Sequence, residues 1–242
     1  MTPADSVNEI CALRIELCDS DPLIWRQVEV PISITLKVLH EVIQAAMGWL
    51  DYHLWEFTIG PRRFGLPMDE DWGTEPRIEA GKVRLREVLT PRKTTMTYVY
   101  DFGDDWEHRL VLTNIRQGEP GIGYPHYVAG KGNAPPEDCG GIPEFYEKLD
   151  IAADPGHHEH NEIRKWLGDY DPKLIDELQI KISLGRIAKQ ERSKGPRQEP
   201  ENLTGTATPN TSTAALAGWI PIRSPNCWPN APIRSGPGIS PN

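Results

Sequence analysis

Cysteine is scarce in this chain of 242 residues, and its four copies form no CxxC pair. Cys11, Cys18, Cys139 and Cys227 match neither a zinc-finger spacing nor the dense disulfide framework of small secreted domains. A chain of this length buries enough apolar surface to fold without disulfides. We therefore expect a protein of the reducing cytoplasm.

Long hydrophobic runs are also missing. No stretch approaches the ~18 consecutive apolar residues that a membrane span needs, and the first residues lack the basic and apolar regions of a secretory signal. These absences predict a soluble protein that is neither exported nor inserted in a membrane.

Positive charge is in deficit. The chain has 26 lysines and arginines against 35 aspartates and glutamates, which gives a formal net charge of −9. Generic nucleic-acid binding draws much of its affinity from neutralising phosphates, so this balance argues against a nucleic-acid partner.

No complete catalytic or cofactor-binding motif is present. Asp101-Phe102-Gly103 spells the magnesium-binding tripeptide of protein kinases, but the phosphate loop, paired lysine and catalytic-loop aspartate of a kinase do not precede it in order. Gly130-Lys131-Gly132 lacks the rest of a phosphate-binding loop. The sequence therefore implies no cofactor.

The composition changes abruptly near Gly195. Residues 195–242 are rich in Pro, Gly, Ser, Thr and Asn and show no apolar periodicity, which predicts a disordered tail. A shifted or read-through reading frame is one hypothesis for its origin. The remaining organised part predicts a single domain over residues 9–190.

The N-terminal third predicts strands and one helix. Alternating apolar residues indicate strands over residues 11–17 and 24–30, joined as an antiparallel hairpin. Thr35 is a helix cap, the apolar residues after it share one helical stripe, and Gly48 is placed as the stop. Period two returns over residues 53–59, which indicates a third strand.

The middle of the chain predicts a loop followed by a second hairpin. Residues 62–79 are polar and rich in Gly, Pro and Asp, and residues 83–89 fit either a short strand or a helical turn. Residues 94–102 and 106–115 form a strand pair around the turn 103–105. Its alternation places on one side Tyr98, Tyr100, Phe102, Trp106, His108, Leu110 and Leu112.

The last third predicts helices. A glycine-rich loop over residues 117–133 and a tight turn over 134–141 precede helices over 143–149, 159–167 and 172–184. The order of strands, helix, strands and then helices indicates an α+β domain with a mainly antiparallel sheet and packed helices.

Two segments stand out as a candidate site. The stretch from Tyr98 to His108 crowds aromatics, carboxylates and a histidine around a glycine turn, which is more typical of a surface than of a core. Residues 134–141 form a second unusual block, and we expect the two to meet. The candidate surface residues are Tyr100, Asp101, Asp104, Asp105, Trp106, His108, Glu137, Asp138, Cys139, Gly140 and Gly141.

The carboxylates of this set allow two interpretations. Several oxygen ligands at close range suit a divalent cation, but aspartates also favour hairpin turns because they bond to the backbone there, and we prefer the turn interpretation. His157 and His160 with Cys139 form a second possible metal set, although solvated histidines at a helix start are the simpler interpretation. Cys139 itself lies beside acidic residues, which favours an inert buried thiol over a nucleophile.

Several motifs in order carry a resemblance to a known family. They are Leu39-His-Glu-Val-Ile-Gln-Ala-Ala-Met-Gly-Trp49, Asp51-Tyr-His-Leu54, Tyr100-Asp-Phe-Gly-Asp-Asp-Trp-Glu-His108, Tyr124-Pro125 and Pro135-Pro-Glu-Asp-Cys-Gly-Gly141. The chain resembles, over residues 9–185, the family named after the third open reading frame of plasmid pRiA4b. The resemblance implies an α+β domain associated with plasmids or mobile elements, and no established activity.

Some members of that family are labelled resolvases of insertion elements. A serine resolvase needs a nucleophilic serine among arginines and a basic helix-turn-helix module. Ser6 and Ser20 have no arginine cluster around them in the sequence. The label therefore finds no chemical support in these residues.

Two function hypotheses follow. The first is a non-catalytic binding or interaction domain, in which Trp106 and Tyr100 supply contact area and the carboxylates select a basic protein or peptide partner. The alternative is a metal-dependent hydrolase or nuclease acting on a phosphate-containing substrate. Its ligands would come from Asp101, Asp104, Asp105, Glu137 and Asp138, with His108 as acid or base.

Overall fold

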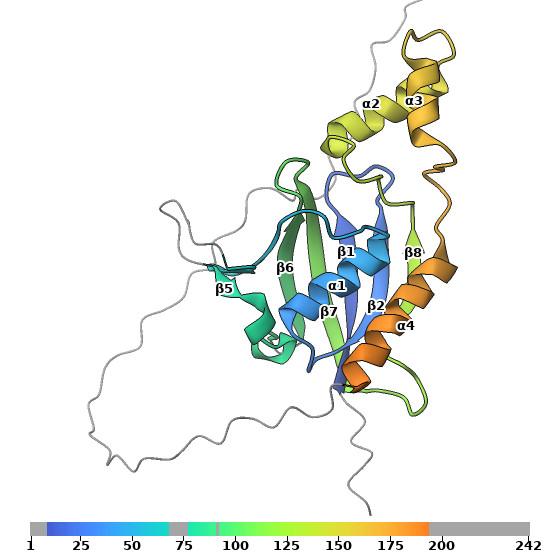
Figure 1. Cartoon of the computed structure of the whole chain (residues 1–242). Coiled ribbons are helices and arrows are strands. Elements are labelled where there is room, and N and C mark those ends of the chain that lie inside the picture. Colours follow the sequence, from blue (N-terminus) through green and yellow to red (C-terminus); the bar gives the residue numbers. More distant parts are fainter. Residues whose placement is uncertain (1–8, 68–76, 91, 194–242) are drawn as a thin grey trace, which may run out of the picture. The chain divides into compact units, whose positions relative to one another are not determined.

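The computed structural model describes residues 9–67, 77–90 and 92–193. In these residues one sheet has the strand order β5-β4-β3-β6-β7-β1-β2-β8 (Figure 1), and each neighbouring pair is antiparallel except β4 with β5. The strands are β1 (Glu9–Leu17), β2 (Trp25–Pro31), β3 (Trp55–Ile59), β4 (Arg62–Gly65), β5 (Ile78–Glu79), β6 (Lys93–Tyr100), β7 (Trp106–Gln117) and β8 (His126–Lys131). The predicted α+β class is confirmed.

The helices form two groups along the chain. Helix α1 and two short 3-10 turns lie between strands, and three α-helices follow β8. Their bounds are α1 (Leu36–Met47), η1 (Ala80–Lys82), η2 (Leu85–Glu87), α2 (Gly141–Ala153), α3 (His160–Leu167) and α4 (Glu177–Ser193). None of the helices in the described part of the chain is long and apolar enough to span a membrane.

The central strands separate an apolar face from a charged one. In β1, Leu13 and Ile15 are buried, whereas Arg14 and Glu16 lie on the opposite face and remain partly exposed. Glu16 there accepts hydrogen bonds from Arg14 and from Arg109 of β7. Alternation along each strand thus gives a sheet with one face for packing and one for solvent.

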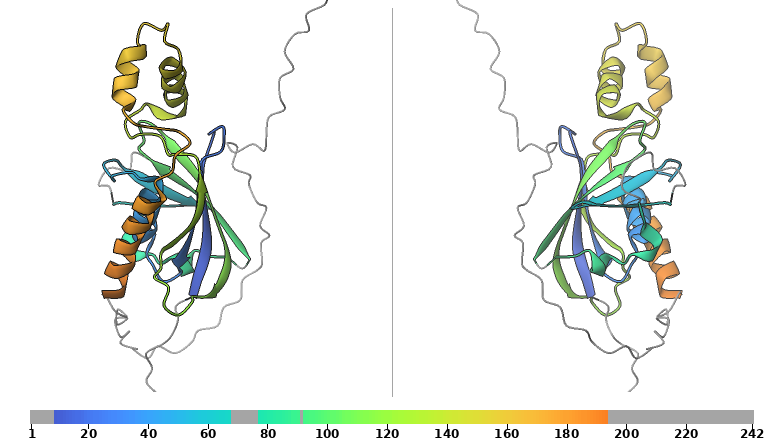
Figure 2. Two further views of the ribbon diagram at one scale, coloured as in Figure 1. Left: turned by 90° about the vertical axis from the view of Figure 1, so that its right-hand side faces the viewer. Right: turned by 90° about the vertical axis from the view of Figure 1, so that its left-hand side faces the viewer.

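Helix α1 forms as its sequence predicts. The Thr35 hydroxyl accepts a hydrogen bond from Val38 N, and Gly48 ends the helix with a φ of 85°. Figure 2 shows α1 and α4 on the same face of the sheet. The apolar side chains of both helices, such as Val42 and Leu184, are buried in the core cluster with the inward residues of the strands.

Arg26 is a buried cation that connects three elements. It lies on β2, donates from Nε to the carbonyl of Ala46 at the end of α1, and donates from Nη1 to Gly132 O just after β8. Trp25 O and Lys131 O accept further bonds from Nη1. Burial lowers the pKa of Arg26, while Tyr127, Tyr170 and the Glu177 carboxylate raise it. The buried charge is tolerated because backbone carbonyls surround it.

Three predicted boundaries are wrong. The loop predicted over residues 62–79 contains β4 and β5 at its two ends, and its residues 68–76 lie outside the described part of the chain. The loop predicted over 117–133 contains β8. Gly130 fits within β8, where a Cβ would lie 2.8 Å from the Tyr127 hydroxyl oxygen and 2.9 Å from Arg26 Cδ. Helix α4 begins at Glu177 and continues through Gly185, since its buried apolar residues outweigh the weak helix preference of one glycine.

Two further predictions concern residues 83–89 and the tail. The strand or turn left open over residues 83–89 is the 3-10 turn η2. The tail predicted over residues 195–242, with Cys227, lies outside the described residues.

Candidate functional site

The two candidate segments meet at one end of the sheet, as predicted. The turn between β6 and β7 lies against the segment that leads from β8 into α2 (Figure 1). Asp104 Oδ2 accepts a hydrogen bond of 3.0 Å from Gly140 N. A Cβ on Gly141 would lie only 2.5 Å from Asp104 O, so this approach requires glycine.

Glu137 connects a third segment to the other two. Its carboxylate accepts hydrogen bonds of 2.5 Å from the Tyr100 hydroxyl and 3.0 Å from Leu50 N. Trp49 Nε1 donates to Pro135 O in the same region. The loop over residues 48–54, between α1 and β3, is thereby held against the turn over residues 134–141.

The aromatic side chains expected at a surface are buried. Tyr100 and Trp106 have exposed fractions of 0%, whereas Phe102, expected on their side, is 43% exposed. Tyr100 and Trp106 are opposite each other as the last pair of β6 and β7, and Trp49 stacks on Tyr100. Strand alternation stops after this pair, so Phe102 falls in the turn and points outward. The expectation that Tyr100 and Trp106 provide contact area is therefore wrong.

His108 is also part of the core. It is completely buried, its Nδ1 lies 2.9 Å from Trp106 O, and its Nε2 has no hydrogen-bond partner. Burial lowers the pKa of His108 from 6.5 to about 4. The side chain is therefore a neutral core imidazole near pH 7, and it cannot reach a substrate.

Cys139 is a buried thiol, as predicted. Burial raises the pKa of Cys139 to about 12, and Asp104 raises it further while Lys148 acts in the opposite direction. The charged groups that act on the thiol are thus Asp104, Lys148 and Glu144 rather than the adjacent carboxylates of Glu137 and Asp138. The thiol stays protonated and is a poor nucleophile.

The side chains of Asp51, His40 and Tyr98 form a hydrogen-bonded chain at the loop over residues 48–54. His40 Nε2 lies 2.8 Å from Asp51 Oδ1, and His40 Nδ1 lies 2.8 Å from the Tyr98 hydroxyl. The Tyr98 hydroxyl also accepts a bond from Gln44 Nε2, and burial raises the pKa of Tyr98 well above its usual value. The order resembles that of a nucleophile activated by a base, but Tyr98 is completely buried, so the chain supports the loop.

Another histidine, His53, lies near the surface with two carboxylates, those of Asp101 and Asp138. His53 Nε2 lies 3.0 Å from Asp138 Oδ1, and His53 Nδ1 lies 3.6 Å from Asp101 Oδ2. Sequence reasoning did not select His53 as a site residue. Its signal was weak, because it stands two residues before a strand and far along the chain from both carboxylates.

A family model described as plasmid pRiA4b ORF-3-like protein matches residues 9–179. The chain belongs to this family. The resemblance carried by the motifs is therefore confirmed. Three of those motifs, over residues 51–54, 100–108 and 135–141, lie in the segments that the fold brings together at the end of the sheet.

Relatives of this pRiA4b ORF-3-like protein occur in bacteria and archaea. It is 37% identical over 197 residues to the uncharacterized protein y4hQ of Sinorhizobium fredii, covering 79% of this chain and 99% of the relative. It also resembles the crystal structure of the protein of unknown function MM3350 from Methanosarcina mazei Go1. That similarity has 34% sequence identity and a TM-score of 0.65, and covers 71% of this chain and 97% of the other.

Of the two serines considered for a resolvase, Ser20 has a structural role in this pRiA4b ORF-3-like chain. The Ser20 hydroxyl donates to Leu17 O and accepts from Ile24 N, which stabilises the β1–β2 turn. Ser6 lies outside the described residues.

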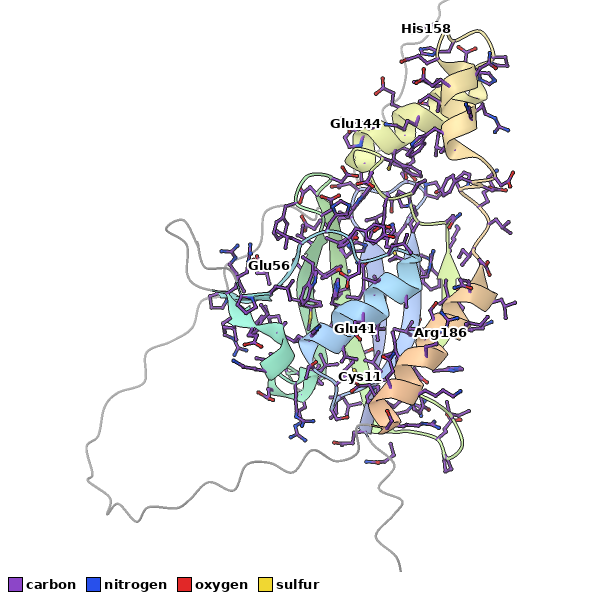
Figure 3. All side chains as sticks on the ribbon, in the orientation of Figure 1. Cys11, Glu41, Glu56, Glu144, His158 and Arg186 are labelled. Atoms are coloured by element: carbon purple, nitrogen blue, oxygen red, sulfur yellow. The ribbon has the colours of Figure 1, made fainter. Side chains whose placement is uncertain are left out.

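The remaining candidate ligands are separated. Asp104 and Glu137 are engaged with Gly140 and Tyr100, and Asp105 is exposed on the turn. Among the described residues, the second potential metal group consists of His157, His158 and Glu159, and Cys139 is not part of it. The predicted set of Cys139 with His157 and His160 therefore does not assemble. Figure 3 shows His158 at the far tip of the α2–α3 pair.

Proposed function

We propose that this protein is a non-catalytic interaction domain that binds a basic peptide segment carrying an apolar side chain. The binding region is the end surface, which we define as residues 50–54 and 102–105 with Asp138. The proposal keeps the acidic and aromatic character expected from the sequence. The contact area comes from the exposed Tyr52 and Phe102 instead of the buried Tyr100 and Trp106.

The observation that carries the proposal is the exposure of apolar side chains beside carboxylates. Tyr52 is 72% exposed, Leu50 and Leu54 of the same loop are exposed, and so is Phe102 in the β6–β7 turn. A shallow cleft lies beside them, lined in part by Tyr52, Leu54, Trp55 and Leu66. Grouped exposed apolar residues are typical of interaction sites, because isolated monomers gain nothing from leaving them in water.

The charges of the same region favour a cationic partner. Asp51, Asp105 and Asp138 are exposed at the end surface. Burial raises the pKa of the neighbouring Glu107, and the carboxylates of Asp105 and Asp19 raise it further. A basic segment would relieve this repulsion. Complementary charge then selects the partner and the apolar side chains supply most of the affinity.

The surface is held in place by groups behind it. Glu137 fixes Leu50 N, the Tyr100 hydroxyl accepts from Tyr52 N, and His40 holds Asp51. A loop positioned before binding loses less conformational entropy when a partner docks. The buried thiols Cys11, Cys18 and Cys139 fit a reducing compartment, which supports a cytoplasmic partner.

The alternative of a metal-dependent hydrolase or nuclease has weaker support. Its expected acid or base, His108, is buried in the core, and two of its expected ligands, Asp104 and Glu137, are occupied by hydrogen bonds. A binding surface requires none of these groups to react.

Synthetic peptides test the proposal by fluorescence anisotropy. Three peptides of equal length are compared: one basic with leucine and phenylalanine, one basic without apolar residues, and one acidic. We expect the first to bind most tightly, with an affinity that weakens as salt screens the charges. The double variant Tyr52→Ala with Phe102→Ala should bind it at least about 10-fold more weakly.

The matched control is Leu178→Ala, which removes an exposed apolar side chain from α4 and should leave the affinity unchanged. Equal affinity for the acidic and basic peptides, or an unaltered double variant, contradicts the proposal.

A further inference from the structure

We propose that His53, Asp101 and Asp138 form a binding site for a divalent transition-metal ion of the zinc type. One ligand atom from each residue lies within 4.8 Å of the other two. The three come from different segments, namely the loop after α1, the β6–β7 turn and the segment before α2. The proposal concerns the metal alone and does not depend on peptide binding.

The His53 imidazole carries the first argument. Its Nε2 is buried and lies 3.0 Å from Asp138 Oδ1, yet the geometry is not that of a hydrogen bond, so this nitrogen has no hydrogen-bond partner. The imidazole as a whole is 29% exposed, but a buried nitrogen without a hydrogen bond is unfavourable. A metal ion accepts the lone pair of such a nitrogen and would satisfy it, while the carboxylates supply charge.

The two carboxylates are positioned by their own turns. Asp101 is nearly buried, and its Oδ1 accepts from Gly103 N at 2.9 Å, which leaves Oδ2 directed toward His53. Asp138 lies between two fixed residues. The Glu137 carboxylate accepts hydrogen bonds from Leu50 N and the Tyr100 hydroxyl, and Cys139 O accepts one from Lys148 Nζ. Its own side chain is 70% exposed and turned toward His53. Ligands held by a supporting shell bind a metal with less reorganisation.

The donor set indicates the kind of metal. One imidazole nitrogen suits zinc better than magnesium or calcium, which prefer oxygen ligands. Two carboxylates balance the charge of a divalent ion, and three protein ligands leave an open position of the kind found in zinc sites that bind water or substrate.

The second histidine group is a poorer candidate. His157, His158 and Glu159 are consecutive residues of one connection, and His157 Nδ1 already accepts a hydrogen bond from Glu159 N. His158 is 83% exposed. It therefore serves as a control for adventitious binding by exposed imidazoles.

Isothermal titration calorimetry of the full chain with ZnCl₂, and separately with MgCl₂, tests the site after treatment with a chelator. We expect one Zn²⁺ per chain and much weaker Mg²⁺ binding. Asp138→Asn and His53→Gln should each weaken Zn²⁺ binding by more than about 10-fold. Asparagine tolerates the φ of 57° at position 138, so Asp138→Asn should keep the wild-type melting temperature without metal.

Two controls complete the experiment. Asp105→Asn removes an exposed carboxylate from the same turn, and His158→Gln removes an imidazole from the other group; both should bind Zn²⁺ as the wild type does. Absence of Zn²⁺ binding would overturn the proposal. Loss of binding in His158→Gln with none in Asp138→Asn would also overturn it.

Discussion

At the end of the sheet, residues that are close in the sequence differ in their exposure to solvent. Tyr100 and Trp106 form the last pair of β6 and β7 and are buried, while Phe102 and Asp105 lie in the turn between them and are exposed. Strand pairing fixes which side each residue faces, and the turn releases that constraint. The exposed residues at this end of the sheet therefore include residues of the turn and of the loop over residues 50–54.

His108 should make stability depend on pH. Its pKa is about 4 in the folded chain and about 6.5 as an unperturbed group, so between these values the unfolded chain binds a proton that the folded chain excludes. The folded state therefore loses stability as pH falls from 6.5 to 4, by about 3 kcal/mol over the window. Urea unfolding at several pH values measures this loss.

His108→Leu removes the titrating group and should flatten that part of the pH profile, whatever its effect on stability at pH 7. The control His158→Gln changes an exposed histidine and should keep the wild-type slope. An identical slope in His108→Leu would show that other groups dominate in this window.

At the scale of elements, three connections depend on one another. The loop after α1 bonds to the turn over residues 134–141 through Trp49 and Leu50, and this turn bonds to the β6–β7 turn through Gly140. Each of these segments is irregular, so its backbone groups find partners in the other two. The position of His53 between Asp101 and Asp138 is a consequence of this arrangement.

Gly141→Ala should destabilise the chain by about 2 kcal/mol or more, because it combines an unfavourable positive φ with a steric clash. The φ of Gly141 is 81°, and the new Cβ would lie 2.5 Å from the backbone oxygen of Asp104. Chemical denaturation measures the change. If Gly141→Ala were neutral, the contact between the two turns would not be tight.

Gly185→Ala is the matched control. Gly185 lies within α4, a Cβ added there would meet no atom within 4 Å, and its φ lies outside the positive range. Alanine should therefore stabilise the helix, by about 0.5–1 kcal/mol.

At the scale of the whole molecule, packing is concentrated on one face of the sheet. The buried cluster in the described residues extends from Cys11 on β1 to Ile187 on α4, so both ends of the domain contribute to it. The opposite face holds ion pairs such as Arg116 with Glu29 and a cation–π contact of Arg14 with Trp25. Exposed pairs of this kind add little stability, and the core supplies most of it.

Deleting residues 196–242 should change the melting temperature by less than about 2 °C, because the described core closes without them. The comparison is a deletion of residues 177–242, which also removes α4 with its buried Ile180 and Leu184 and should lower the melting temperature strongly. Differential scanning calorimetry distinguishes the two. A large decrease with the shorter deletion would assign the tail a structural role.

The sequence alone determined those features whose cause is local. The periods of β1, β2 and β6, the Thr35 cap and Gly48 stop of α1, and the family motifs are all properties of neighbouring residues. Local periodicity and turn chemistry are sufficient for such features. The meeting of residues 101–108 with residues 134–141 was expected from the sequence, but the contact itself depends on the tertiary structure.

Only the tertiary structure decided which of these residues face water. Burial of Tyr100 depends on Trp49 and Glu137, β8 depends on the buried Arg26 of β2, and His53 gains its carboxylates from two distant turns. Each depends on a partner far along the chain, and no local pattern encodes that distance. The end surface and the His53 group were for this reason visible only after folding.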